Sequence, residues 1–189
     1  MAIVKYNPFI DGLSGTVGKK INFRVRKGKT IVAVKRGPNT TPPTEEQQEV
    51  REQFIKASLF AQNAIKDPVT KALYQKAAKG GQTAYNAAFR DAVKPPVIDN
   101  IDTDAYKGAV GDKILIRARD VITPQSVTVA IVSEAGVVLE QGDAVLNIND
   151  RRTWIYTATA ANAAVPRTTV IVSATDLPGN TAEKEVTIP

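Results

Sequence analysis

The sequence contains neither cysteine nor histidine among its 189 residues. Without these side chains the protein has no disulfide bond, no thiol nucleophile and no zinc site built from Cys and His. It also lacks an imidazole general base, so catalytic triads that depend on histidine are excluded. Catalysis would rest on carboxylates, hydroxyls or amines alone. We therefore expect a protein that is not an enzyme and that needs no cofactor.

Long apolar runs are also lacking. No run of about 18 apolar residues is present, so no membrane span is expected. The segment Met1–Pro8 has no apolar core of the length found in signal peptides. We expect a chain made in the cytoplasm. Its final place in a virion or an extracellular assembly stays open, because some export routes use no cleaved signal.

The aspartates near the expected strand ends lack the spacing of a calcium loop. Asp102 and Asp104 form an Asp-x-Asp pair, but the glycine and the distal glutamate of an EF-hand are missing. Because Asp side chains commonly bond to nearby backbone in turns, we interpret these residues as turn formers and expect no metal site. Glu134 and Glu140 flank a predicted hairpin turn, where we expect both to be solvated.

Charge is distributed unevenly along the chain. Residues 1–94 contain 17 Lys and Arg against 7 Asp and Glu, whereas residues 95–189 contain 8 against 12. The local pattern changes from helical to strand-like at the same place, across Lys94-Pro95-Pro96. We therefore predict two domains with different partners. Residues 1–94 form a basic α+β part with a β-hairpin and three helices, and residues 95–189 form an all-β domain.

The positive charge is concentrated in residues 1–36, which contain nine Lys and Arg and one acid. Apolar residues alternate with basic and polar ones over 21–26, which predicts a strand with one apolar and one basic face. Gly28 marks a tight turn to a return strand over 30–34. The glycine-rich segment 11–18 is expected to be a loop. The candidate contact residues are Lys19, Lys20, Arg24, Arg26, Lys27, Lys29, Lys35 and Arg36.

We expect these basic residues to dock on a protein, either a second copy of this chain or another component of an assembly. The alternative is binding to nucleic-acid phosphates, where each contact releases counterions. Nucleic-acid-binding elements often interleave aromatic and basic residues so that bases can stack. In this hairpin Phe23 belongs to the apolar face, which favours docking and leaves nucleic acid as the alternative.

Three helices are predicted between residues 44 and 93. Thr44 and Gln47 have the spacing of a capping box at the start of the first helix. Asp67-Pro68 ends that helix and begins the second, and the third covers residues 83–93. The residues expected to face the core are Val50, Phe54, Ala57, Ala61 and Ile65, then Val69, Leu73 and Ala77, then Tyr85, Ala88, Phe89 and Ala92.

The second half has strand patterns at intervals of roughly eight to twelve residues, which is typical of a β-sandwich. Strict alternation over 113–119 and 126–133 predicts that Ile114, Ile116, Val127 and Val129 face inward, and we expect the single Trp154 in the core. Seven strands are predicted, over residues 97–101, 113–119, 126–133, 137–141, 153–159, 169–174 and 183–188.

The last predicted hairpin resembles the end of bacterial immunoglobulin-like repeats. It reads Asp176-Leu177-Pro178-Gly179-Asn180 before a final alternating strand, and those repeats commonly end in Asp, two residues, Gly-Asn and a strand. The opening 96–99 and the turn 110–113 resemble the same class. The resemblance covers about half of the chain. It implies an immunoglobulin-like β-sandwich, a binding or spacer module found on adhesins and phage virions.

The first half resembles an uncharacterised bacterial and phage-associated family. The residues that carry this resemblance are Gly12–Gly18, the turn Lys27-Gly28-Lys29, and the helix start with Gln47, Arg51 and Phe54. The family has no assigned activity, so the resemblance implies architecture rather than chemistry. Together the patterns predict a structural protein of a virion, filament or surface-type assembly. Its basic part docks or self-associates, and its immunoglobulin-like domain projects outward.

Overall fold

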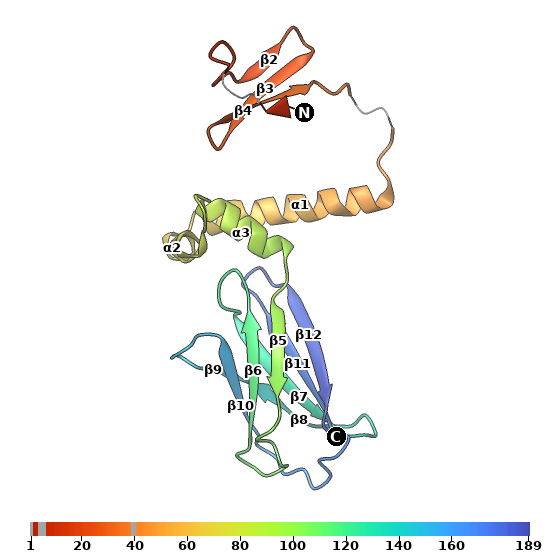
Figure 1. Cartoon of the computed structure of the whole chain (residues 1–189). Coiled ribbons are helices and arrows are strands. Elements are labelled where there is room, and N and C mark those ends of the chain that lie inside the picture. Colours follow the sequence, from red (N-terminus) through yellow and green to blue (C-terminus); the bar gives the residue numbers. More distant parts are fainter. Residues whose placement is uncertain (1, 4–6, 39–40) are drawn as a thin grey trace. The chain divides into compact units, whose positions relative to one another are not determined.

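The computed structural model describes residues 2–3, 7–38 and 41–189, and the chain divides into two compact units. The first unit is Met1–Thr44 and the second is Glu45–Pro189. The described residues form three α-helices and three antiparallel sheets of four strands each (Figure 1). The chain is therefore of mixed α+β class, with more strands than helices.

The first unit is a four-stranded sheet in the order β1-β4-β3-β2. The predicted hairpin is confirmed as β3 and β4, which pair from Ile21 with Val34 to Arg26 with Lys29. Between them Lys27 and Gly28 both have positive φ, 51° and 70°, as a two-residue type I′ turn requires. The bounds are β1 Ala2–Ile3, β2 Gly15–Val17, β3 Ile21–Arg26 and β4 Lys29–Val34.

Two strands beyond the predicted hairpin complete this sheet. β1 pairs with β4, and β2 pairs with β3. The expectation that the whole segment 11–18 is a loop was wrong, because β2 hydrogen-bonds to the free edge of β3. The loop before β2 is tied to the sheet. The Gly12 N–H donates to Thr30 Oγ1 at 2.7 Å, and Thr30 Oγ1 donates to Asp11 Oδ1 at 3.0 Å.

The three predicted helices are confirmed, and they open the second unit. Their bounds are α1 Glu45–Ala64, α2 Pro68–Ala77 and α3 Ala84–Val93. Asp67 caps α2 by accepting a hydrogen bond from the Thr70 N–H at 2.8 Å. Thr83 caps α3 by accepting one from the Asn86 N–H at 3.3 Å. α3 packs against both α1 and α2.

The buried stripe of α1 is shorter than predicted. Ala57, Ala61 and Ala64 are buried, but Val50 and Phe54 are 64% and 59% exposed. The reason is length. Because α1 has 20 residues and α3 has 10, α3 leaves most of the first half of α1 uncovered. Figure 1 shows the first half of α1 running past α3.

The prediction for the inner face of α2 was also wrong. Val69 and Leu73 are exposed, and Tyr74 is the fully buried residue of this helix. Tyr74 points inward because its hydroxyl donates a hydrogen bond to the Asp91 carboxyl of α3 at 2.6 Å. Its ring also packs edge-on against Phe60 of α1 at a centroid distance of 6.3 Å, so a polar and an apolar contact together hold this face of α2 inward.

The rest of the second unit is two four-stranded sheets, ordered β5-β6-β10-β9 and β12-β11-β7-β8. The second half thus has eight strands rather than the predicted seven. The additional strand, β9, has two residues, too few to show an alternating pattern. The bounds are β5 Val97–Asp102, β6 Lys113–Arg119, β7 Ser126–Val132, β8 Val138–Asp143, β9 Val145–Leu146, β10 Thr153–Thr157, β11 Thr169–Thr175 and β12 Thr181–Thr187.

The two sheets face each other across one apolar core, in the manner of a sandwich. The predicted inward residues of β6 and β7 are confirmed, and Trp154 is 6% exposed, as expected. Alternate residues reach this core because side chains along a strand point to opposite faces. The buried side chains include Ile98, Ile101, Tyr106, Ile114, Ile116, Val127, Val129, Ile131, Trp154, Tyr156, Val170 and Val172.

A second, smaller core joins the helices to the sandwich. Val121 and Ile122, which follow β6, and Leu177, which follows β11, pack against the buried residues of the helices. The helices therefore belong to the same compact unit as the sandwich. The boundary expected between residues 94 and 95 stays a prediction. Within the described residues, no helix is both long enough and apolar enough to cross a membrane.

Candidate functional site

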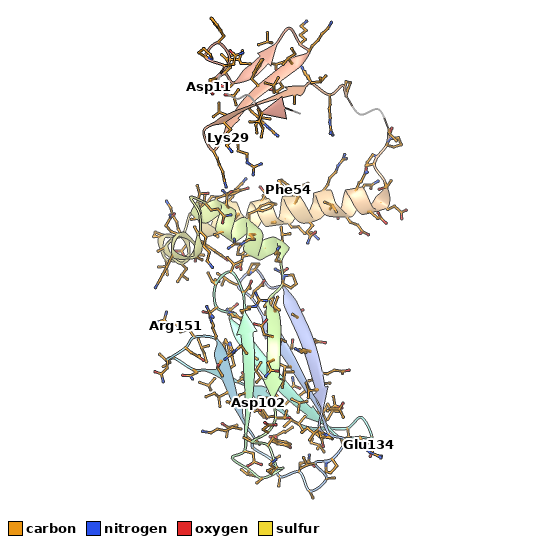
Figure 2. The ribbon with its side chains drawn as sticks, viewed as in Figure 1. Asp11, Lys29, Phe54, Asp102, Glu134 and Arg151 are labelled. Atoms are coloured by element: carbon orange, nitrogen blue, oxygen red, sulfur yellow. The ribbon has the colours of Figure 1, made fainter. Side chains whose placement is uncertain are left out.

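The eight basic residues singled out from the sequence all lie in the first unit, and all are exposed. Lys27 lies in the hairpin turn, and Arg24 pairs across the sheet with Ile31. Arg26 pairs with Lys29, which Figure 2 labels at the start of β4. Because directly paired residues lie on the same face of a sheet, Arg24, Arg26 and Lys29 share one face. Their role in binding stays a prediction.

The opposite face of the same sheet is apolar and mostly exposed. Val17 pairs with Ile21, and Ile21 pairs with Val34, so these side chains share a face. Thr30 is the only buried residue among those described in this unit. We call this surface the apolar sheet face. Its exposed residues are Val17 at 59%, Ile21 at 41%, Val25 at 47% and Val34 at 80%.

A cluster of buried carboxyl groups lies where the helices meet the sandwich. Asp91 on α3 and Asp176 after β11 are fully buried, and Asp120 after β6 is partly buried. Asn180 links two of them, since its Nδ2 donates to Asp176 Oδ2 at 2.7 Å and to the Asp91 main-chain oxygen at 3.2 Å. The Tyr74 hydroxyl donates to Asp91 Oδ2.

Burial shifts the acidity of this cluster. It raises the pKa of Asp91 to about 7, although the hydrogen bond from Tyr74 acts in the opposite direction. It also raises the pKa of Asp120 to about 6. A hydrogen bond between the two carboxyls raises the pKa of Asp91 and lowers that of Asp120, so the shared proton belongs to Asp91. Burial also raises the pKa of the Tyr74 hydroxyl.

The cluster can hold one proton near neutral pH. It also joins α3 to the segments of the sandwich that follow β6 and β11. Among the described residues, Asp91 Oδ1 and Asp120 Oδ2 are buried and have no other hydrogen-bond partner. A proton between them satisfies both oxygens, whereas two buried negative charges would repel each other. We interpret the cluster as a junction whose stability depends on pH. Among the described residues, no group of three or more acidic side chains is placed to hold a metal ion.

Glu140 is buried, so the expectation that it is solvated was wrong. Its Oε2 accepts hydrogen bonds from the Thr159 N–H at 2.8 Å, the Thr159 hydroxyl at 2.9 Å and the Ala160 N–H at 3.0 Å. These donors replace water around the carboxylate. Burial, and then the charge of Glu140, raises the pKa of Tyr156 to about 12. Glu134 is exposed, as expected, and pairs with Arg167.

The sequence held a signal for Asp91 that the pattern analysis missed. Ala84, Ala87, Ala88 and Asp91 recur at i, i+3, i+4 and i+7, which is the spacing of one helix face, and all four are buried. A carboxyl group in line with three core alanines indicates a buried charge that needs a partner. The partners Tyr74, Asp120 and Asn180 come from other elements.

No family model matches the chain, and no curated protein sequence matches it. Among solved structures, an engineered protein is 24% identical over 49% of this chain and 19% of that one, with a TM-score of 0.36. CopC from Methylosinus trichosporium OB3b is 15% identical over 49% of this chain and 92% of that one, with a TM-score of 0.37. The chain spans only a small part of the engineered protein. Both likenesses are partial and carry no weight in assigning a function.

Proposed function

We propose that the protein is a non-enzymatic structural component that self-associates through its first unit and presents a β-sandwich domain. The observation that carries this proposal is the apolar sheet face. A sheet normally buries its apolar side against another layer, and exposed apolar patches commonly mark interaction sites. In the first unit Thr30 is the only buried residue among those described, so the sheet lacks an apolar core of its own.

A second copy of the chain is the partner that suits this surface. Arg24, Arg26 and Lys29 lie on the other side of the sheet, so two apolar sheet faces can meet without bringing these charges together. Sheets packed face to face are a common arrangement, with a spacing of about 10 Å. The same patch on both copies would form a two-fold symmetric contact.

We propose further that the sandwich is immunoglobulin-like. If the strands β5 to β12 are lettered A, B, C, C′, D, E, F and G, the two sheets have the strand orders ABED and GFCC′. Immunoglobulin-like sandwiches have strands in this order, which supports the proposal. The Asp176-to-Asn180 turn is supported by hydrogen bonds from the Asn180 N–H and Nδ2 to the Asp176 carboxylate. Such a domain would project from a virion, filament or surface-type assembly as a spacer or binding module.

Nucleic acid is the second candidate partner, because Arg24, Arg26 and Lys29 share one exposed face. Phosphate binding of this kind weakens steeply with salt, since each contact releases counterions. Charge reversal at Arg24, Arg26 and Lys27 should then abolish DNA or RNA binding. If a fluorescent oligonucleotide shows no binding even at low salt, this second candidate is excluded.

The double variant Val25→Thr with Val34→Thr should weaken self-association of the full chain by at least about tenfold. Threonine keeps the β-branched shape that strands favour, while its hydroxyl makes burial of the face costly. Sedimentation velocity gives the dissociation constant. The matched control is Val138→Thr with Val145→Thr, two exposed strand valines of the second unit, which should have no effect. Equal association of both variants and the parent chain would refute a role for the apolar sheet face.

A further inference from the structure

The second unit contains a groove lined by α2 and by loops and strands of the sandwich. Its larger part has a volume of about 700 Å³. A neighbouring hollow of about 520 Å³ shares Arg119 and Arg152 with it. We call the two together the basic groove. The cationic residues that line it are Lys76, Lys79, Arg117, Arg119, Arg151 and Arg152.

Positive charge exceeds negative charge in this groove. Its carboxyl groups are Asp99, Asp120 and Asp150. Asp99 is engaged by Arg119, whose Nε lies 2.8 and 2.9 Å from the two carboxylate oxygens. Asp150 is held by its own turn, where it accepts a hydrogen bond from the Arg152 N–H at 3.0 Å. Asp150 also attracts the charge of Arg117. The positive charge available to an acidic partner therefore comes from the other cationic residues of the groove, Lys76, Lys79, Arg151 and Arg152.

The groove also has an apolar side. Leu73 of α2 is 49% exposed, and it lines the groove together with Ala77, Val121 and Ile122. A nucleic-acid backbone would use the cations but not this apolar side. An amphipathic helix with acidic and apolar residues fits both, since such helices bind by placing an apolar face in a groove.

The first half of α1 has the matching chemistry. Residues 45–55 contain four glutamates, one arginine and no lysine. Val50 and Phe54 are exposed and one turn apart. Glu46 precedes Val50 by four residues and so lies on the same helix face, and Glu49 follows Glu46 by three residues. Phe54, labelled in Figure 2, contacts the Phe89 ring of α3 at a centroid distance of 4.9 Å and is otherwise largely exposed.

One copy cannot place its own helix in its own groove. The second half of α1 is fixed by packing on α3, and α2, which lines the groove, follows the last residue of α1. The acidic half is at the other end of a 20-residue helix, about 30 Å long. Figure 1 shows α2 beside the C-terminal end of α1. The acidic half of α1 can therefore reach a groove only on another copy.

We propose that the first half of α1 of one copy docks in the basic groove of a second copy. This inference rests on the proposed self-association and adds a second contact to it. The contact is head-to-tail, because each copy offers a helix to one neighbour and a groove to another. Such contacts extend into rings or open filaments, unlike the two-fold contact of the apolar sheet face.

Two charge-reversal variants of the full chain test this pairing by sedimentation velocity. Glu46→Lys with Glu49→Lys changes the helix, and Lys79→Glu with Arg152→Glu changes the groove. Each variant alone should associate at least about tenfold more weakly than the parent chain. An equal mixture of the two should regain association, because the basic helix of one variant matches the acidic groove of the other. Glu183→Lys with Glu185→Lys, the same charge change on exposed positions of β12, should have no effect.

The outcomes separate this inference from the proposed function. If both variants associate like the parent chain while Val25→Thr with Val34→Thr weakens association, the helix-in-groove contact is wrong and the apolar sheet face stands. If each variant is impaired but the mixture does not recover, the pairing of these two surfaces is wrong. If the parent chain itself never associates, both proposals fail.

Discussion

Asp91→Asn should stabilise the second unit at pH 8 and remove most of its pH dependence between pH 5 and pH 8. Burial raises the pKa of Asp91 to about 7. Between its ordinary pKa near 4 and this value, the folded chain holds a proton that the unfolded chain releases. The free energy of unfolding therefore falls as pH rises across that range, by up to about 1.4 kcal/mol per pKa unit.

Asparagine resembles the protonated form of this carboxyl group. Its oxygen can keep the hydrogen bond from Tyr74, and its amide can donate to Asp120 without a buried second charge. We expect a gain of roughly 1–3 kcal/mol at pH 8 and little change at pH 5. Urea unfolding followed by Trp154 fluorescence and by helical circular dichroism measures both.

Two further variants make the test specific to this cluster. Asp104→Asn replaces an exposed aspartate and should leave stability unchanged at both pH values. Tyr74→Phe removes the donor to Asp91 and should cost more stability at pH 8 than at pH 5, because the charged carboxylate needs that donor more than the neutral acid does. Equal stability of the parent chain at pH 5 and pH 8 would contradict the raised pKa.

Gly108→Ala should destabilise the sandwich by roughly 2–4 kcal/mol. Gly108 has a φ of +88°, a conformation that L side chains rarely adopt. An added Cβ would also collide with the main-chain oxygen of Asn162 and with the Val165 side chain. The backbone cannot easily move away, because the Asn162 N–H donates to the Gly108 oxygen at 2.8 Å.

Gly111→Ala is the matched control for this substitution. Gly111 has a similar φ, +95°, but an added Cβ would meet no atom within 4 Å. Its cost is then the backbone conformation alone, about 1–2 kcal/mol. Thermal unfolding of both variants gives the difference between their free energies of unfolding. This difference is the cost of the collision at residue 108. If the two alanines cost the same, the close approach of Asn162 to Gly108 is not a feature of the folded protein.

Local signals predicted the elements of this fold well. The starts of α2 and α3 follow from Asp67 and Thr83, because a capping side chain bonds to backbone only three residues away. The strands β6 and β7 follow from alternation, because burial on one face imposes a period of two. These interactions are contained within a few neighbouring residues, so the sequence displays them directly.

Features set by tertiary contacts could not be predicted in the same way. The exposure of Val50 and Phe54 depends on where α3 ends, and the burial of Glu140 depends on donors at Thr159 and Ala160 from another segment. The concentration of positive charge in residues 1–36 was evident because these charges are close together in the sequence. The basic groove was not evident, because its cations come from α2 and the residues after it, from β6 and from the segment before β10, and they meet only in the folded unit.

The most direct test of the account is sedimentation velocity of the unmodified chain over a wide range of protein concentration, at low and at moderate salt. The account predicts that the average mass rises with concentration above the 20.3 kDa of one chain. Added salt should weaken the part of this association that depends on the basic groove and leave the apolar contact largely intact. A single species with the mass of one chain at every concentration and salt would contradict it.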